Sequence, residues 1–107
     1  MSDIEYRFVI CDDKISTHGS YSWNKSVNKY NYEETEDFKK CVNLVEKTID
    51  NFSHDLVYTI DCCICDKKPK IIEINSWACA GLYNCDRVKM IKDINQMIIK
   101  RQEDFIF

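Results

Sequence analysis

The apolar residues of this 107-residue sequence repeat at two different periods, and the order of these periods limits the folds open to the chain. Short β-branched and aromatic runs are typical of strands, whereas apolar residues three or four positions apart are typical of amphipathic helices. Two strand-like runs precede one helix-like segment, and the same succession occurs again. A chain of this length has the usual size of one domain, so residues 1–107 are expected to form a single domain of order ββαββα.

The strand-like runs form two pairs, each joined by turn-forming residues. In chain order the four runs are 6–11, 15–23, 56–65 and 70–75. Asp12, Asp13 and Lys14 separate the first pair, and residues 66–69 separate the second. Each pair is therefore predicted to form an antiparallel hairpin. The second run passes Gly19, which indicates an edge strand with a bulge.

Two segments have the period of an amphipathic helix. The first begins near Thr35 and carries apolar residues at Phe38, Cys41, Val42, Val45, Ile49 and Phe52. The second begins at Asp86, a plausible N-cap, ends near Arg101 and has an expected apolar face of Val88, Ile91, Ile94, Met97 and Ile98. Together with the hairpins, these helices predict an α+β domain in which an antiparallel sheet carries both helices packed on one face.

Charge and cysteine content exclude several classes of protein. The formal net charge is -3, which argues against a nucleic-acid binder because such proteins carry basic stripes. Charged residues interrupt every apolar run, so no membrane segment is expected. Seven cysteines without a signal-peptide pattern favour reduced thiols and a cytoplasmic location.

Alternation along the second hairpin brings two carboxylates onto one surface. The expected apolar face comprises Tyr58, Ile60, Cys62, Ile64, Ile72 and Ile74. A three-residue connection at 66–68 would place Asp61 opposite Glu73 on the other face, with Asn75 beside them. Like charges in opposite positions are destabilising, and a bound cation would offset their repulsion. Carboxylate and amide oxygens suit Mg²⁺ with a nucleotide, although the same pattern also fits the solvated face of an ordinary sheet.

The same residues resemble a known family. The run Ile71-Ile72-Glu73-Ile74-Asn75, followed by Ala80-Gly81-Leu82-Tyr83 and Asp86, resembles the C-terminal part of an ATP-grasp domain, where an apolar strand ends in Glu-x-Asn. Two earlier runs agree in order: 5–9, which contains an arginine and precedes Lys14-Ile15, and 56–61, which ends in an aspartate. The resemblance covers nearly all of the chain but only half of the family's domain.

The resemblance implies roles for five residues. Glu73 and Asn75 would bind Mg²⁺ or Mn²⁺, and Asp61 would be a third ligand or a carboxylate behind them. Arg7 would be the catalytic group that faces the transferred phosphate of ATP, because a guanidinium stays charged and pairs with phosphoryl oxygens. The backbone at Gly81 would approach the nucleotide, although a simple turn before the helix also explains this glycine.

Complete relatives activate a small-molecule carboxylate as an acyl phosphate and transfer it to an amine or a thiol. Their N-terminal lobe, which supplies nucleotide-binding lysines, has no counterpart in this sequence. If the chain is active, it is expected to be an ATP-dependent ligase completed by a second polypeptide or by a homodimer. The alternative is a non-catalytic lobe that binds a partner protein through its sheet or through Trp23, Trp77 and Tyr83.

The cysteines offer a rival site. Four thiols, those of Cys62, Cys65, Cys79 and Cys85, could in principle bind zinc, but their spacing fits poorly. Buried free thiols are the ordinary interpretation, because free cysteine behaves as a small apolar residue. His18 and His54 are the two histidines, and neither has a neighbourhood that indicates a Cys–His catalytic pair.

Overall fold

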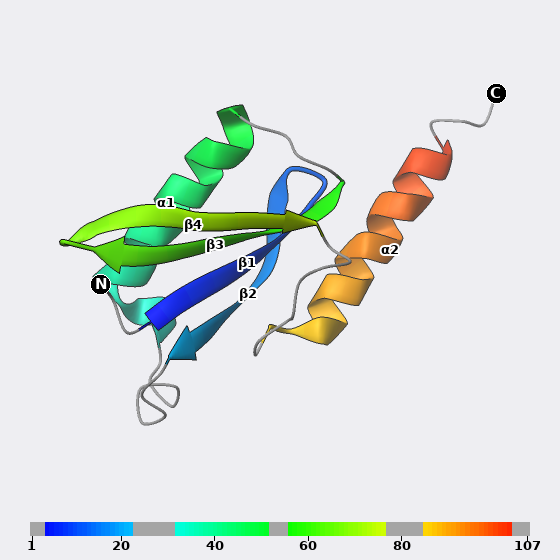
Figure 1. Cartoon of the computed structure of the whole chain (residues 1–107). Coiled ribbons are helices and arrows are strands. Elements are labelled where there is room, and N and C mark those ends of the chain that lie inside the picture. The colour runs from blue at the N-terminus through cyan, green and yellow to red at the C-terminus, as the bar shows by residue number, and fades with distance from the viewer. Residues whose placement is uncertain (1–3, 23–31, 52–55, 77–84, 104–107) are drawn as a thin grey trace.

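The computed structural model describes residues 4–22, 32–51, 56–76 and 85–103 and confirms the α+β class and the order ββαββα (Figure 1). The elements in chain order are β1 (Ile4–Cys11), β2 (Lys14–Ser22), a short 3-10 helix (Tyr32–Glu34), α1 (Glu36–Asn51), β3 (Val57–Cys65), β4 (Lys68–Ser76) and α2 (Arg87–Glu103). No helix in these described segments is long and apolar enough to cross a membrane.

The four strands form one antiparallel sheet in the order β2-β1-β3-β4. Both predicted hairpins are present, and β1 and β3 pair at the centre of the sheet. β2 is an edge strand with a bulge, as expected, but the irregularity lies between Val9 and Ile10 of β1, opposite Ser16, and not at Gly19. Pro69 lies in the other edge strand, where the missing N–H group is tolerated.

Each hairpin closes through two residues in the left-handed region. Asp12 and Asp13 have φ angles of 52° and 62°, and Asp66 and Lys67 have φ angles of 52° and 66°. Positive φ at both central residues defines the type I′ turn, whose twist matches that of paired strands. The predicted three-residue connection at 66–68 is therefore wrong, because Lys68 already pairs with Cys65.

A bulge in β4 compensates for this shorter turn. Asp61 pairs with Glu73, as predicted, but Cys62 pairs with Ile71, so Ile72 is an extra residue in β4. An extra residue changes which face the side chains before it occupy. Ile71 accordingly packs against the core beside Ile74, whereas Ile72, which was expected in the core, is exposed.

The main core lies between α1 and one face of the sheet. The apolar side of α1 comprises Phe38, Cys41, Val45 and Ile49, which contact alternate residues of β1 and β3: Tyr6, Phe8, Ile10, Tyr58, Ile60, Cys62 and Ile64. Thr35 accepts a hydrogen bond from the backbone N–H of Phe38 (3.2 Å) and so caps the first turn of α1. The predicted amphipathic face of the first helix is thus confirmed.

The second helix packs on the opposite face of the sheet, which corrects the expectation that both helices share one face. Val9 lies between Phe8 and Ile10 in β1, so its side chain points away from α1, and it packs with Cys85 and Met90. Figure 1 shows α1 behind the strands and α2 on their other side. The alternate residues of β1 are apolar enough for both faces of this strand to be covered.

The buried side of α2 also differs from the predicted one. Met90 (3% exposed), Ile94 and Met97 face the molecule, whereas Val88 (67% exposed) and Ile91 (53%) face solvent. Apolar residues occupy more than half of the circumference of this helix. Their period alone could not indicate which part of it contacts the sheet.

Candidate functional site

The predicted site residues lie in one row across the sheet, on the face opposite α1. The strand register aligns Gly19 of β2, Arg7 of β1, Asp61 of β3 and Glu73 of β4. Successive side chains of a strand point to opposite faces, and the neighbours of Arg7 and Asp61 belong to the α1 core. The hairpins therefore bring three charged side chains from three adjacent strands to one surface, which we call the charged row.

Arg7 and Asp61 form a buried, two-pronged ion pair in this row. The Nε atom of Arg7 donates to Oδ1 of Asp61 (2.8 Å), and its terminal NH2 group donates to Oδ2 (2.7 Å). The two residues are only 7% and 3% exposed. A buried charge is costly unless it is paired and hydrogen-bonded, and this parallel geometry fulfils both conditions. The pair also holds the guanidinium in one fixed orientation.

The ion pair explains why Asp61 and Glu73 tolerate opposite positions. The sequence suggested that a cation must offset the repulsion between the two carboxylates. In the structure the Arg7 guanidinium supplies a positive charge beside Asp61, on the side away from Glu73. Glu73 is itself exposed, so water screens the remaining repulsion. The predicted pairing is confirmed, while metal binding by these residues stays a prediction.

A second row lies one position further along the strands. It joins Thr17, Val9, Thr59 and Asn75, from β2 to β4. Thr59 is fully buried and its hydroxyl donates to the backbone carbonyl of Asn75 (3.5 Å). Asn75 is half-buried and lies two residues after Glu73 on the same side of β4. The Glu-x-Asn spacing thus places a carboxylate and an amide beside each other at this edge of the sheet.

The donor set on this surface fits a hard divalent cation. Glu73 and Asn75 offer side-chain oxygens, and Asp61 lies in the adjacent strand. A carboxylate has about four lone-pair positions, of which the two hydrogen bonds from Arg7 use two on Asp61. Oxygen ligands with one or two carboxylates are what Mg²⁺ takes in proteins, and the same set suits Mn²⁺. Among the described residues, no group of three or more His, Cys, Asp or Glu side chains could hold a metal ion, so Asn75 is needed to complete a ligand set.

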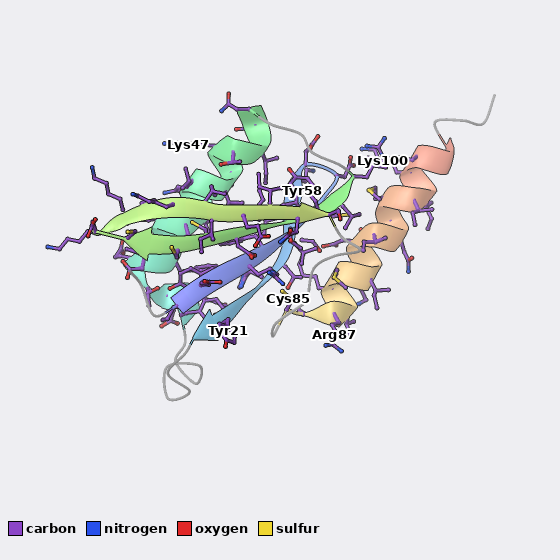
Figure 2. All side chains as sticks on the ribbon, in the orientation of Figure 1. Tyr21, Lys47, Tyr58, Cys85, Arg87 and Lys100 are labelled. Carbon is purple, nitrogen blue, oxygen red and sulfur yellow. The ribbon has the colours of Figure 1, made fainter. Side chains whose placement is uncertain are left out.

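Cys85 lies against the charged row and was not predicted to belong to the site. Its thiol is within 4.0 Å of the Arg7 carbonyl oxygen, and its side chain packs on Val9 at the start of α2 (Figure 2). Burial raises the pKa of Cys85 to about 11, although the nearby Arg7 charge opposes this rise. The thiol is therefore protonated at neutral pH and has little nucleophilic character. The residue closes one side of the row without adding a reactive group.

Polar contacts fix the N-terminal half of α2 beside this surface. Asp86 caps the helix by accepting from the backbone N–H of Lys89 (3.0 Å), and its own N–H donates to the Thr17 hydroxyl (3.0 Å). Ser16 donates to Asp93 (2.7 Å), to which Lys89 is also paired (2.8 Å). The Lys89 and Ser16 hydrogen bonds lower the pKa of Asp93, so this carboxylate stays charged. The bulge in β2 and the predicted cap at Asp86 together determine where α2 begins.

Several predicted residues lie outside the described segments: Gly81, Trp23, Trp77, Tyr83, Cys79 and His54. The described members of the four-cysteine set do not converge, because Cys62 belongs to the α1 core and Cys85 packs on the other face of the sheet. Cys11, Cys41, Cys62, Cys63, Cys65 and Cys85 are all free thiols. The described cysteines thus agree with the interpretation of buried thiols.

The ion pair between Arg7 and Asp61 was the main feature that sequence reasoning missed. The two residues are 54 positions apart and belong to different hairpins. Alternation placed Asp61 on the polar face of its own hairpin, but it gave no information on which strand would lie beside β3. A signal was available in Arg7 itself, because an arginine inside a run of buried apolar residues needs an acidic partner.

Comparison with known families agrees with this geometry. Residues 3–93 match a family of ATP-grasp domains, described as the second family of its clade. The match includes Arg7, Asp61, Glu73 and Asn75 and therefore covers the whole charged row. No curated protein and no solved structure gives a significant match to the chain. The sequence match spans most of the chain, and on this basis the chain belongs to this family of ATP-grasp domains.

Proposed function

We propose that this chain binds a magnesium nucleotide on the surface formed by the charged row and Asn75. The observation that carries the proposal is the alignment of Arg7, Asp61 and Glu73 on three adjacent strands, opposite the α1 core, in a chain that belongs to an ATP-grasp family. A cation, an arginine and acidic ligands on one surface match the chemical needs of a phosphate group bridged by a metal.

Each residue has a distinct role in this proposal. Glu73 and Asn75 bind Mg²⁺ or Mn²⁺ through oxygen atoms, and Asp61 supports them from the adjacent strand. Asp61 also orients Arg7, whose guanidinium faces the phosphoryl oxygens of ATP. The bound metal would neutralise phosphate charge. Gly81, which lies outside the described segments, keeps its predicted role as a backbone contact to the nucleotide.

The reaction class follows from the family. We infer an ATP-dependent ligase reaction, in which a small-molecule carboxylate is activated and joined to an amine or a thiol. The second side of the nucleotide cleft would come from another polypeptide or from a second copy of this chain. No observation on the described residues favours the alternative of a non-catalytic interaction lobe.

Calorimetric titration with ATP tests the proposal. Wild-type protein is titrated in the presence of Mg²⁺ and again with the metal chelated, and the same titrations are made on Glu73→Gln. The matched control is Glu36→Gln, which removes an exposed carboxylate from α1 on the other side of the sheet. We expect binding that requires Mg²⁺, survives in the control and is lost in Glu73→Gln.

Three outcomes would contradict the proposal. Binding of equal strength without Mg²⁺ would remove the metal from the site. Equal binding by Glu73→Gln and wild type would remove Glu73 from it. If the folded wild-type chain does not bind ATP at all, this chain does not form a nucleotide site alone. Sedimentation of the wild type with and without Mg-ATP would then show whether a second copy completes the cleft.

A further inference from the structure

A cavity of about 470 Å³ lies on the opposite face of the sheet from the charged row, between the β1–β2 hairpin and α1. Its lining includes the turn residues Asp13 and Lys14 and the helix residues Ile49 and Asp50. The turn of this hairpin and the C-terminal end of α1 lie at the same end of the molecule (Figure 1). Cavities of a few hundred Å³ are large enough for small organic ligands.

The inner wall of the cavity is aromatic and apolar. Phe8 and Phe38 are buried and stack with their ring centroids 5.6 Å apart, and the His18 ring lies 4.8 Å from that of Phe38. Val42 and Ile49 of α1 extend this wall. Because these side chains belong to the main core or pack against it, the wall is held rigidly, and it offers an apolar surface to a ligand.

The mouth of the cavity is acidic. Asp13 comes from the β1–β2 turn, and Glu46 and Asp50 come from successive turns of α1. Glu46 and Asp50 are exposed and four residues apart, a spacing at which like charges repel each other. Lys14 is the single lysine or arginine among the described lining residues, so carboxylates exceed cations at this mouth.

The helix end strengthens this negative potential. α1 ends at Asn51, and its last turn contains no basic residue although it contains Asp50. The C-terminal end of a helix carries a partial negative charge, so an acidic residue there is unfavourable and a cation is favourable. Burial lowers the pKa of His18, whose Nδ1 atom lies 2.9 Å from the Tyr32 hydroxyl oxygen. His18 is therefore uncharged at neutral pH and does not offset the carboxylates.

We propose that this cavity binds a small organic cation with an aromatic or apolar body. The cationic group would lie among Asp13, Glu46 and Asp50 at the mouth, and the body would contact Phe38 and Val42. Such a ligand would relieve the repulsion between the carboxylates and would cover the apolar wall. The site is independent of the proposed nucleotide surface, because the sheet separates them.

Titration with two probes of matched shape tests the proposal. 2-Phenylethylammonium carries the cationic group, and 2-phenylethanol has the same aromatic body without the charge. Binding to the full chain is followed by NMR chemical shifts and by calorimetry. We expect the amine to bind at least about tenfold more tightly than the alcohol at low salt, and this difference should decrease at high salt.

Two variants locate the binding site. Glu46→Gln/Asp50→Asn removes two charges from the mouth and should abolish the preference for the amine. The matched control, Glu36→Gln/Asp37→Asn, removes two charges from the other end of the same helix and should keep the preference. Val42→Phe fills the cavity and should weaken the binding of both probes. Because Val42 is only partly buried, this variant is expected to fold, and circular dichroism checks each variant.

Equal affinities for the amine and the alcohol would overturn the proposal, as would no binding of the amine by the wild type. Unchanged binding by the Glu46/Asp50 variant would also overturn it. Amine binding by Glu73→Gln should equal that of the wild type, because Glu73 lies on the other face of the sheet. This comparison separates a failure of the cavity proposal from a failure of the proposed nucleotide site.

Discussion

The two faces of the central strands are built from alternate residues of the same sequence, yet they are stabilised in different ways. On the α1 face, Phe8 and Ile60 pack against an apolar helix. On the α2 face, the adjacent residues Arg7 and Asp61 bury an ion pair. Apolar contacts tolerate many substitutions of similar volume, whereas a buried ion pair requires both partners. The second face therefore restricts its residues more strongly than stability alone would require.

The largest effect is expected from breaking the ion pair. Asp61→Ala leaves the buried Arg7 charge without its carboxylate partner and should lower the free energy of unfolding by about 3–5 kcal/mol. Glu73→Gln, in the same row but exposed, should change it by no more than about 0.5 kcal/mol. Urea denaturation of the two variants measures this difference. Equal losses in both variants would mean that the two carboxylates contribute alike.

An apolar replacement of the pair sharpens the comparison. Arg7→Met/Asp61→Leu should lose much less stability than Asp61→Ala, because no charge is left buried. The same double variant should lose Mg-ATP binding if the charged row is a nucleotide site. A stable protein without binding would show that the ion pair is retained for function and not for folding.

The next effect distinguishes the two sides of α2. Met90→Ala removes a buried side chain from the α2 face and should lower the free energy of unfolding by about 2–5 kcal/mol. Ile91→Ala, one position further along, should change it by no more than about 0.5 kcal/mol, because this side chain is exposed. Thermal and urea denaturation of both variants measure the difference. A larger loss for Ile91→Ala would indicate that α2 presents its other side to the molecule.

Much of the sheet could be predicted from the sequence, because local rules determine it. The two hairpins follow from turn residues next to β-branched runs, and alternation placed Asp61 opposite Glu73. The prediction reached this pair through a turn that was one residue too long and a strand without a bulge. The two differences compensate at Glu73 but not at Ile72, which is exposed and not in the core.

The arrangement of the hairpins relative to each other could not be predicted in this way. The ion pair exists because β1 lies beside β3, and no local pattern in either hairpin determines that contact. The position of α2 was missed for a related reason. Its apolar residues surround more than half of the helix, so Met90 and Ile91 were equally plausible contacts until the opposite face of β1 was known to need covering.

A smaller effect compares the N-terminal caps of the two helices. Thr35→Ala removes the hydroxyl that accepts from the Phe38 N–H, and Asp86→Ala removes the carboxylate that accepts from the Lys89 N–H. Each substitution should lower the free energy of unfolding by about 1 kcal/mol. Thr35→Ser and Asp86→Asn, which keep an accepting oxygen, serve as controls and should lose much less. Equal losses in the alanine variants and the controls would show that the caps do not act through these oxygens.

The smallest effect is a pH dependence on the α1 face. Burial lowers the pKa of His18 below its ordinary value of 6.5, so the folded state resists protonation. As the pH falls below 6.5, the unfolded chain binds a proton that the folded chain does not, and stability decreases until the pH reaches the lowered pKa. His18→Gln should reduce this loss of stability, and urea denaturation at a series of pH values between about 7.5 and about 4 measures it. The control is Asp93→Asn on the α2 face, whose wild-type carboxylate has a lowered pKa and therefore contributes to the pH dependence only near and below 3.8. If His18→Gln left the slope between about pH 6.5 and about pH 5 unchanged, the buried imidazole would not be its source, and another group on the α1 face would have to take up the proton.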